Sequence, residues 1–202
     1  MRSVCLIRAS LVAAGLLAAS SAFAAMRSPD AMTYPTSPTY PASVNMMSGG
    51  AAASVAPIPR ETVSYYGPYG PGTIIISTSE RRLYLVLPGH EALKYGVGVG
   101  RPGFTWGGNL RVSMKREWPS WTPPAAMLKR LPHLPRYMKG GIGNPLGARA
   151  LYLGSSEYRI HGSNEPDTIG QAVSSGCIRM TNNDVKDLYD RVPVGAKVVV
   201  QN

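Results

Sequence analysis

Short apolar runs separated by glycine, proline and polar turns fill the chain from residue 73 onward. Runs of this kind, rich in Val, Ile, Leu and Tyr, are shorter than ordinary helices and are typical of strands. The pattern predicts one mostly β domain at residues 72–202, which is enough chain to bury a core. The expected strands lie at residues 73–77, 83–87, 93–99, 109–115, 150–153, 158–161 and 197–201. The first two are expected to form a hairpin across residues 78–82.

One helix is predicted near residues 181–192. The apolar residues that follow i, i+3, i+4, i+7 spacing there are Val185, Leu188, Tyr189 and Val192. Thr181 followed by Asp184 resembles a capping box, and Pro193 with Gly195 supplies the stop. Cys177, which lies shortly before this helix, is therefore expected on a strand or loop.

Proline interrupts the strand pattern between residues 117 and 147. A patternless stretch of this length inside a compact domain is unusual unless it forms a functional loop or lid. We interpret it as a loop that covers the substrate. The alternative is an inert surface excursion in which Trp118 and Trp121 are packing anchors.

The first 24 residues have the pattern of a signal peptide. Arg2 and Arg8 precede an apolar stretch at residues 11–19, and Ala-Phe-Ala at 22–24 matches a cleavage site. The apolar stretch is too short for a membrane-spanning helix, so no membrane span is expected after cleavage. Residues 25–71 are rich in Pro, Ser and Tyr and predict a disordered linker, whose tyrosines could alternatively contact a wall polymer or partner.

The formal net charge of +10 becomes +8 once Arg2 and Arg8 are removed, because the signal segment has no acidic residue. A positive balance favours association with anionic polymers. The chain has no Lys/Arg run or basic helix of the kind that binds nucleic acid, so no nucleic-acid partner is expected.

Cys177 would be the single cysteine of the mature chain, because cleavage removes Cys5. Exported proteins usually pair their cysteines or lack them, so a lone thiol indicates reactivity. A neighbouring imidazole, here His161, accepts a thiol proton and stabilises the thiolate. Small residues before the cysteine allow a tight turn, and Ser175 and Gly176 are expected to offer backbone N–H groups to an oxyanion.

Structural interpretations stay open for single residues: a buried small hydrophobe for Cys177 and a hydrogen-bonded core residue for His161. A metal site of Cys177, His161, His133 and His90 lacks the paired spacing of zinc ligands, so no metal or cofactor is expected. The glycines of residues 96–100 are not followed by a helical pattern, which disfavours a nucleotide loop.

The residues at 161–164 and 174–180 resemble the motif of the YkuD-type L,D-transpeptidases, in their periplasmic ErfK/YbiS-like branch. The similarity extends through residues 121–124, 144–147 and 194–198 and covers most of residues 73–202. It implies a β-sandwich-like catalytic domain with one helix in its C-terminal region and a long substrate-covering loop, preceded by the disordered tether.

The resemblance also implies roles for single residues. Cys177 matches the family nucleophile, His161 the general base, and Gly162 the residue whose backbone carbonyl orients the imidazole. The expected substrate-binding residues are Arg179, Trp121 and Asn144. Many relatives carry His where this chain has Ser175, which leaves the assignment of the base unchanged.

The implied substrates are peptidoglycan stem peptides. The thiolate would attack the diaminopimelate–D-Ala bond, and the acyl group would pass to an amine of another stem, to an outer-membrane protein or lipoprotein, or to a free D-amino acid. Hydrolysis of the same bond by a cysteine peptidase and wall binding without turnover are the alternatives. The expected location is outside the cytoplasm, in the periplasm.

Overall fold

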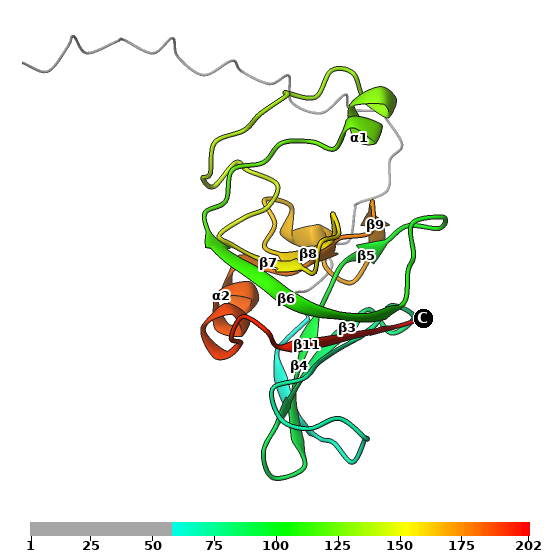
Figure 1. Cartoon of the computed structure of the whole chain (residues 1–202), viewed down its shortest axis with the longest axis vertical. Coiled ribbons are helices and arrows are strands. Elements are labelled where there is room, and N and C mark those ends of the chain that lie inside the picture. The colour runs from blue at the N-terminus through cyan, green and yellow to red at the C-terminus, as the bar shows by residue number, and fades with distance from the viewer. Residues whose placement is uncertain (1–57) are drawn as a thin grey trace, which may run out of the picture. The chain divides into compact units, whose positions relative to one another are not determined.

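The computed structural model describes residues 58–202, so the predicted signal peptide and residues 25–57 of the predicted linker lie outside the described residues (Figure 1). The strands are β1 (Glu61–Ser64), β2 (Ile74–Ser77), β3 (Arg82–Leu87), β4 (Glu91–Gly96), β5 (Val99–Gly100), β6 (Gly108–Glu117), β7 (Arg149–Leu153), β8 (Arg159–His161), β9 (Ala172–Ser174), β10 (Ile178–Arg179) and β11 (Lys197–Gln201). The helices are α1 (Ala125–Arg130) and α2 (Asn182–Arg191), with a 3-10 turn at Pro166–Thr168.

Nine strands form one mixed sheet in the order β1-β4-β3-β2-β11-β6-β7-β8-β10, and β5 pairs with β9 in a separate two-stranded sheet. The long sheet is curled rather than flat (Figure 1). The last strand in sequence, β11, lies in the middle of the sheet, parallel to β2 and antiparallel to β6. The mostly β class and the hairpin between β2 and β3 are confirmed, and the strands form a curled nine-stranded sheet and a small two-stranded sheet.

The core is built from the apolar runs that predicted the strands. Ile74 and Ile76 of β2 pair with Val198 and Val200 of β11, and all four side chains are buried. Burying a side chain of this size contributes about 1.5–3 kcal/mol. Backbone pairing and apolar burial therefore act at the same positions in the centre of the sheet.

Helix α2 closes one side of the core and agrees with its prediction. The Thr181 hydroxyl accepts a hydrogen bond from the Asp184 amide at 3.1 Å, as the capping pattern indicated. Val185 and Leu188 are buried toward the core cluster. At the other end, the Lys115 ammonium donates to the Val192 carbonyl at 2.7 Å, which places a positive charge where the helix dipole is negative.

Four local predictions were wrong or incomplete. Strand β1 lies inside the expected disordered linker and pairs with β4, so ordered structure begins before residue 72. The expected strand at 93–99 is divided into β4 and β5. The two- and three-residue strands β9 and β10 were not predicted, because segments this short carry no readable period.

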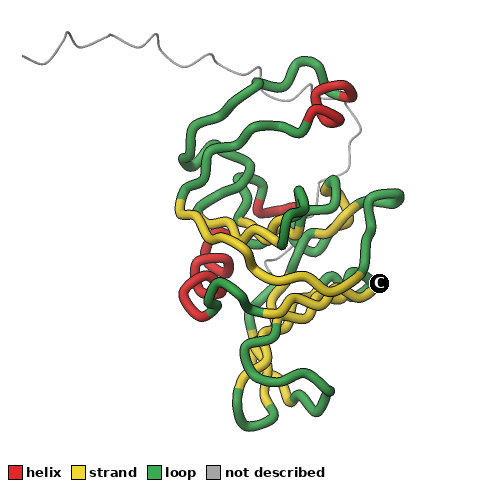
Figure 2. The backbone as a smooth tube through the Cα atoms, viewed as in Figure 1, coloured by secondary structure: helices red, strands yellow, loops and turns green. Residues whose placement is uncertain are grey.

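The fourth difference lies in residues 118–147, which contain the six-residue helix α1 among long loops (Figure 2). The sequence did not predict this helix, because it begins directly after Pro124 in a proline-rich stretch. No residue of α1 is buried. Neither helix among residues 58–202 has the length and apolarity needed to cross a membrane.

Candidate active site

The short parallel strands β8 and β10, with the residue just before β10, bring four polar side chains to one cavity. In the β8–β10 pair, Ile178 lies opposite Ile160, and both side chains are buried in the core. Because successive side chains of a strand point to opposite faces, the residues that flank these isoleucines point away from the core. Those residues are Arg159, His161, Cys177 and Arg179, and all four line the same cavity.

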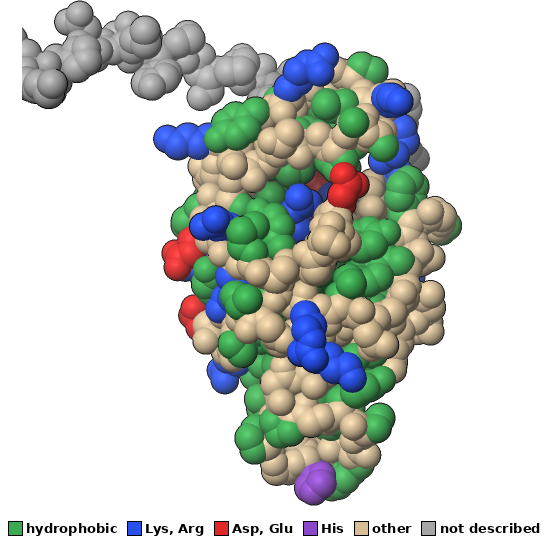
Figure 3. All heavy atoms as spheres, in the orientation of Figure 1, with side chains coloured by type: hydrophobic (Ala, Val, Ile, Leu, Met, Phe, Trp, Pro, Cys, Tyr) green, Lys and Arg blue, Asp and Glu red, His purple; other side chains and the backbone are tan. Residues whose placement is uncertain are grey.

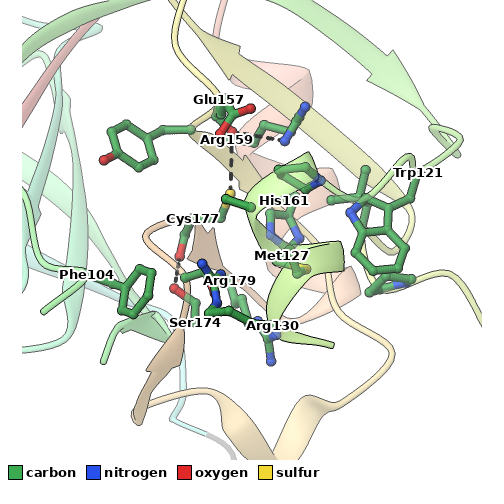
Figure 4. A pocket seen from close by; sticks show the side chains of 16 residues that line it. Phe104, Trp121, Met127, Arg130, Glu157, Arg159, His161, Ser174, Cys177 and Arg179 are labelled. Atoms are coloured by element: carbon green, nitrogen blue, oxygen red, sulfur yellow. Dashed lines mark hydrogen bonds between the residues drawn. The ribbon is translucent and has the colours of Figure 1, made fainter. Parts of the chain in front are cut away.

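The cavity has a volume of about 420 Å³ and lies between this strand pair and the segment that carries α1 (Figure 4). Phe104, Trp121 and Met127 contribute apolar walls. The sequence therefore correctly predicted that Cys177 and His161 face a common open space.

The imidazole of His161 is held by the backbone carbonyl of the next residue. Its Nδ1 lies 2.6 Å from the Gly162 oxygen. A carbonyl oxygen only accepts hydrogen bonds, so Nδ1 carries the proton and Nε2 of the neutral ring is left as the acceptor. The predicted contact between Gly162 and His161 is present in this form.

Burial lowers the pKa of His161 to about 4, with further lowering by the charges of Arg179 and Arg159 and a partial opposing effect of the Gly162 hydrogen bond. The ring is 4% exposed, so the charged form loses its hydration almost completely. Near neutral pH the imidazole is therefore uncharged and can accept a proton.

The Gly162 carbonyl, which holds His161, is fixed where the segment at residues 162–163 closely approaches the segment at residues 147–148. A β-carbon added to Gly162 would collide with the Asn182 side chain and lie 3.0 Å from the Ala148 nitrogen. Asn182 joins the segments, because its Oδ1 accepts from the Ala148 amide at 2.9 Å and its Nδ2 donates to the Ser163 carbonyl at 3.0 Å. Sequence reasoning missed Asn182, which is the first residue of α2 and gave no signal apart from that position.

Cys177 is a free, partly exposed cysteine. Its Sγ lies 3.7 Å from the Glu157 carbonyl oxygen, to which the thiol donates. Burial raises the pKa of the thiol, while hydrogen bonds from Arg159 and the charges of Arg159 and Arg179 oppose this rise. A raised thiol pKa beside a lowered imidazole pKa means that the resting pair is a neutral thiol and a neutral ring.

The turn before Cys177 is tied together by Ser174. The Ser174 hydroxyl donates to the Cys177 carbonyl at 2.6 Å and accepts from the Gly176 amide at 3.1 Å. The Gly176 amide is therefore already occupied, which corrects its predicted place as a free oxyanion donor. Among residues 58–202, the amides of Ser175 and Cys177 donate to no protein group, so these two remain available.

A stacked aromatic pair that the sequence did not indicate supports the same turn. The rings of Trp106 and Tyr158 stack with centroids 4.2 Å apart, and the indole N–H donates to the Gly176 carbonyl at 2.7 Å. Gly176 has a φ of +108°, and a β-carbon there would lie 2.6 Å from the Tyr158 ring. Glycine is therefore required both by its backbone conformation and by the neighbouring ring.

The predicted substrate-binding residues have different positions. Arg179 and Trp121 line the cavity, and Arg179 also forms an ion pair with Glu165 at 2.9 Å. The side chain of Asn144 is buried and bonds within its own loop, donating to the Lys139 carbonyl at 3.0 Å and accepting from the Leu146 amide at 2.9 Å. The prediction of Asn144 as a substrate contact was wrong, because its polar atoms are used to fold the loop.

No metal centre is evident in the part of the chain that the structure describes. Within residues 58–202, no three His, Cys, Asp or Glu side chains are grouped closely enough to hold an ion. His90 lies in a turn, where its ring stacks on Tyr66 at 5.4 Å, and it does not line the cavity with Cys177.

Comparison with known proteins identifies the family. The L,D-transpeptidase catalytic domain family, YkuD, matches residues 71–200. An Escherichia coli K12 protein named "Probable L,D-transpeptidase ErfK/SrfK" is 38% identical over 134 residues, which cover 63% of this chain and 43% of the relative. The chain thus spans less than half the length of that relative.

Two solved structures share the fold. L,D-transpeptidase 3 of Mycobacterium tuberculosis aligns with a TM-score of 0.53 at 19% identity, covering 66% of this chain and 62% of that one. A Brucella melitensis chain described as "Probable carnitine operon oxidoreductase caia" is 46% identical, with a TM-score of 0.50, covering 73% of this chain and 97% of that one. Because the family match extends from residue 71 to residue 200 and includes His161 on β8 and Cys177 just before β10, this chain belongs to the YkuD family of L,D-transpeptidase catalytic domains.

Proposed function

We propose that the chain is a peptidoglycan L,D-transpeptidase in which Cys177 is the nucleophile and His161 the general base. One observation carries this proposal: the two side chains face one cavity from neighbouring parallel strands, and the ring is held in the tautomer that leaves Nε2 free. A thiol beside such an acceptor can form a covalent acyl intermediate.

In the first half-reaction the thiol turns from the Glu157 carbonyl and its proton passes to His161 Nε2. The sulfur attacks the carbonyl carbon of diaminopimelate in the bond to the terminal D-alanine. When the C–N bond breaks, the departing amine takes the proton from His161, which leaves a thioester on Cys177. Neutral thiol and imidazole in the resting site favour this concerted transfer over a preformed ion pair.

The negative oxygen that develops during attack needs hydrogen-bond donors. The unoccupied amides of Ser175 and Cys177 are the donors that we assign to it, in place of the Gly176 amide. Preorganised donors of this kind are worth about 2.7–4 kcal/mol each in the transition state. Ser174 keeps the turn in shape by bonding both neighbouring backbone groups.

Stem peptides carry carboxylates, and the cavity offers cations to receive them. Arg130, Arg159 and Arg179 line it together with a single acidic residue, Glu157. We assign substrate contacts to Arg179 and to the indole of Trp121. Asn144 instead supports the loop that brings Pro145 and Leu146 to the cavity wall.

In the second half-reaction an amine attacks the thioester carbonyl and gives a proton to His161 Nε2. When the C–S bond breaks, His161 passes that proton to the sulfur and the thiol is regenerated. The amine of another stem gives a 3→3 cross-link, and a lysine of an outer-membrane protein or lipoprotein gives an attached protein. Water in place of the amine gives a carboxypeptidase. We further propose that residues 1–24 are a signal peptide and that the chain acts in the periplasm.

Incubation of the purified protein with tetrapeptide muropeptides, followed by mass spectrometry, tests the function. Cross-linked dimers with loss of D-alanine are expected. Shortened tripeptides without dimers would show hydrolysis, and unchanged tetrapeptides would contradict both activities. The Cys177→Ala variant is the matched control, because it removes one sulfur atom from the same cavity.

A further inference from the structure

Arg159 lies directly beside the Cys177 sulfur. Continuing the β8–β10 register by one residue from Ile160 and Ile178 places Arg159 opposite Cys177. Both side chains line the cavity. Their polar atoms converge on one acceptor, because Arg159 Nη1 donates to the Glu157 carbonyl at 2.9 Å and Cys177 Sγ reaches the same oxygen at 3.7 Å (Figure 4).

Among residues 58–202, the guanidinium of Arg159 keeps an N–H donor that no acceptor uses. Its Nε is buried and has no hydrogen-bond partner. Within residues 58–202 no carboxylate forms an ion pair with Arg159, whereas Arg179 is paired with Glu165 at 2.9 Å. A buried donor without a partner costs about 1–3 kcal/mol, and an anion that forms in the cavity lined by Arg159 would offset this cost.

The thiolate of Cys177 is that anion. As a thiol the sulfur donates to the Glu157 carbonyl, but a thiolate has no hydrogen to donate and is repelled by the carbonyl oxygen. It must leave that oxygen and find donors elsewhere. Arginine offers five N–H donors on a permanently charged group, and Arg159 is already within the same cluster of contacts.

We propose that Arg159 is a positioning residue that holds the Cys177 sulfur at the Glu157 carbonyl in the resting site and stabilises the thiolate once the proton has left. The importance of this role for catalysis rests on the proposed function, but the interaction itself does not. The thiol, the carbonyl and the guanidinium form one three-membered cluster in which the proton state of sulfur decides its partner.

The charges that face the sulfur agree with this role. His161 stands on the same strand as Arg159, Arg179 on the strand of Cys177, Glu157 before β8, and Arg130 on α1 across the cavity. Of these groups, Arg159 contributes most to lowering the pKa of the thiol against the effect of burial, first through a backbone hydrogen bond and then through its charge and a side-chain hydrogen bond. Removing the guanidinium keeps the backbone bond but takes away the charge and the side-chain bond, so thiol ionisation is expected to move to higher pH.

The test is the pH dependence of Cys177 alkylation by iodoacetamide, in which the thiolate forms a C–S bond and expels iodide. Arg159→Gln is expected to shift the midpoint upward by about one pH unit and to slow alkylation at pH 7 about tenfold. Arg159→Lys keeps the positive charge but loses the planar set of guanidinium N–H donors, so a smaller shift of the alkylation midpoint is expected. Arg111→Gln is the matched control, because Arg111 also donates to a backbone carbonyl but lies on β6 and does not line the cavity.

Unchanged midpoints in both Arg159 variants would overturn the proposal. A shift common to Arg159→Gln and Arg111→Gln would also overturn it, because a general change in charge would then be the cause. Thermal unfolding of each variant checks that the fold is kept, and Arg159→Lys decides the question if Arg159→Gln does not fold. If the wild-type protein shows no muropeptide turnover while the midpoint still shifts, the proposed function fails and the Arg159 interaction stands.

Discussion

The strand pair that carries Cys177 and His161 and the segment at residues 118–147 form opposite walls of one cavity, yet they are built differently. The strand wall alternates buried isoleucines with cavity-facing side chains and is tied into the nine-stranded sheet. The opposite wall consists mainly of loops around α1, a helix without a buried residue. Cys177 and His161 thus lie on the wall whose backbone is hydrogen-bonded into the sheet.

The two walls also differ in charge. Residues 118–147 contain Lys129, Arg130, Arg136 and Lys139 and no acidic residue. Lys and Arg side chains gather at this end of the molecule in Figure 3. The strand wall balances its cations with Glu157 and Glu165. The loop wall is therefore the more basic of the two walls.

The largest effect is expected from Cys177→Ala and His161→Ala. Because Cys177 is the proposed nucleophile and His161 its proposed base, we expect an acylating β-lactam such as imipenem to form an adduct with the wild-type protein and with neither variant, as measured by intact-protein mass spectrometry. Circular dichroism should show both variants folded. An adduct at wild-type rate in either variant would refute the assignment of that residue.

The next largest effect concerns pH. The pKa of His161 is about 4 in the folded protein and 6.5 in a free side chain, so the unfolded chain takes up a proton first as the pH falls. Stability is therefore full above pH 6.5 and declines by about 3 kcal/mol toward pH 4. Urea unfolding at several pH values measures this decline.

The His161→Ala variant is the control for that measurement, because Glu61 and Asp187 also have lowered pKa values and contribute their own acid sensitivity. The difference between wild type and variant isolates the imidazole. An identical pH slope in both proteins over pH 4–6.5 would show that His161 is not held neutral by burial.

A Gly→Ala substitution in each wall adds one methyl group and so compares how closely the two walls are packed. Gly162→Ala should collide with Asn182 and displace the carbonyl that holds His161, lowering kcat about 100-fold and stability by about 1–3 kcal/mol. Gly143→Ala lies in the loop wall, where a β-carbon meets nothing within 4 Å, and should change neither quantity measurably. Equal losses in kcat and stability from both variants would remove the distinction between the walls.

The smallest effect is expected from a charge in the loop wall. Arg130 lines the cavity with its guanidinium 5.1 Å from the centre of the Phe104 ring. Arg130→Gln should raise KM for stem peptides several-fold with little change in kcat, as steady-state kinetics would show. Lys129→Gln removes the same charge one residue earlier, outside the cavity lining, and should leave KM nearer to wild type.

Sequence patterns predicted the parts of this molecule that depend on local order. The apolar runs of β2, β3 and β11 and the capped helix α2 were predicted with bounds close to those observed, because their side chains alternate or repeat in a readable way. Cys177 and His161 were predicted from their chemistry in a chain expected to be exported. Gly162 was placed correctly beside His161 through the family resemblance.

Features that depend on distant contacts were not predicted. The two-residue strand β10 exists through its pairing with β8. Asn182 acts by joining segments far apart in sequence, and nothing in its neighbours shows this. The errors at Asn144 and Gly176 have the same origin, because both residues had chemistry suited to a ligand but had already formed bonds within the protein.

The central place of β11 has a consequence for the order of folding. This strand is synthesised after every other strand, yet it joins β2 to β6 and so connects the two halves of the sheet. A nascent chain that lacks it holds two separate sheet fragments with exposed edges. Pairing across most of the chain's length is slow, so the two halves of the sheet stay unjoined until β11 arrives between β2 and β6.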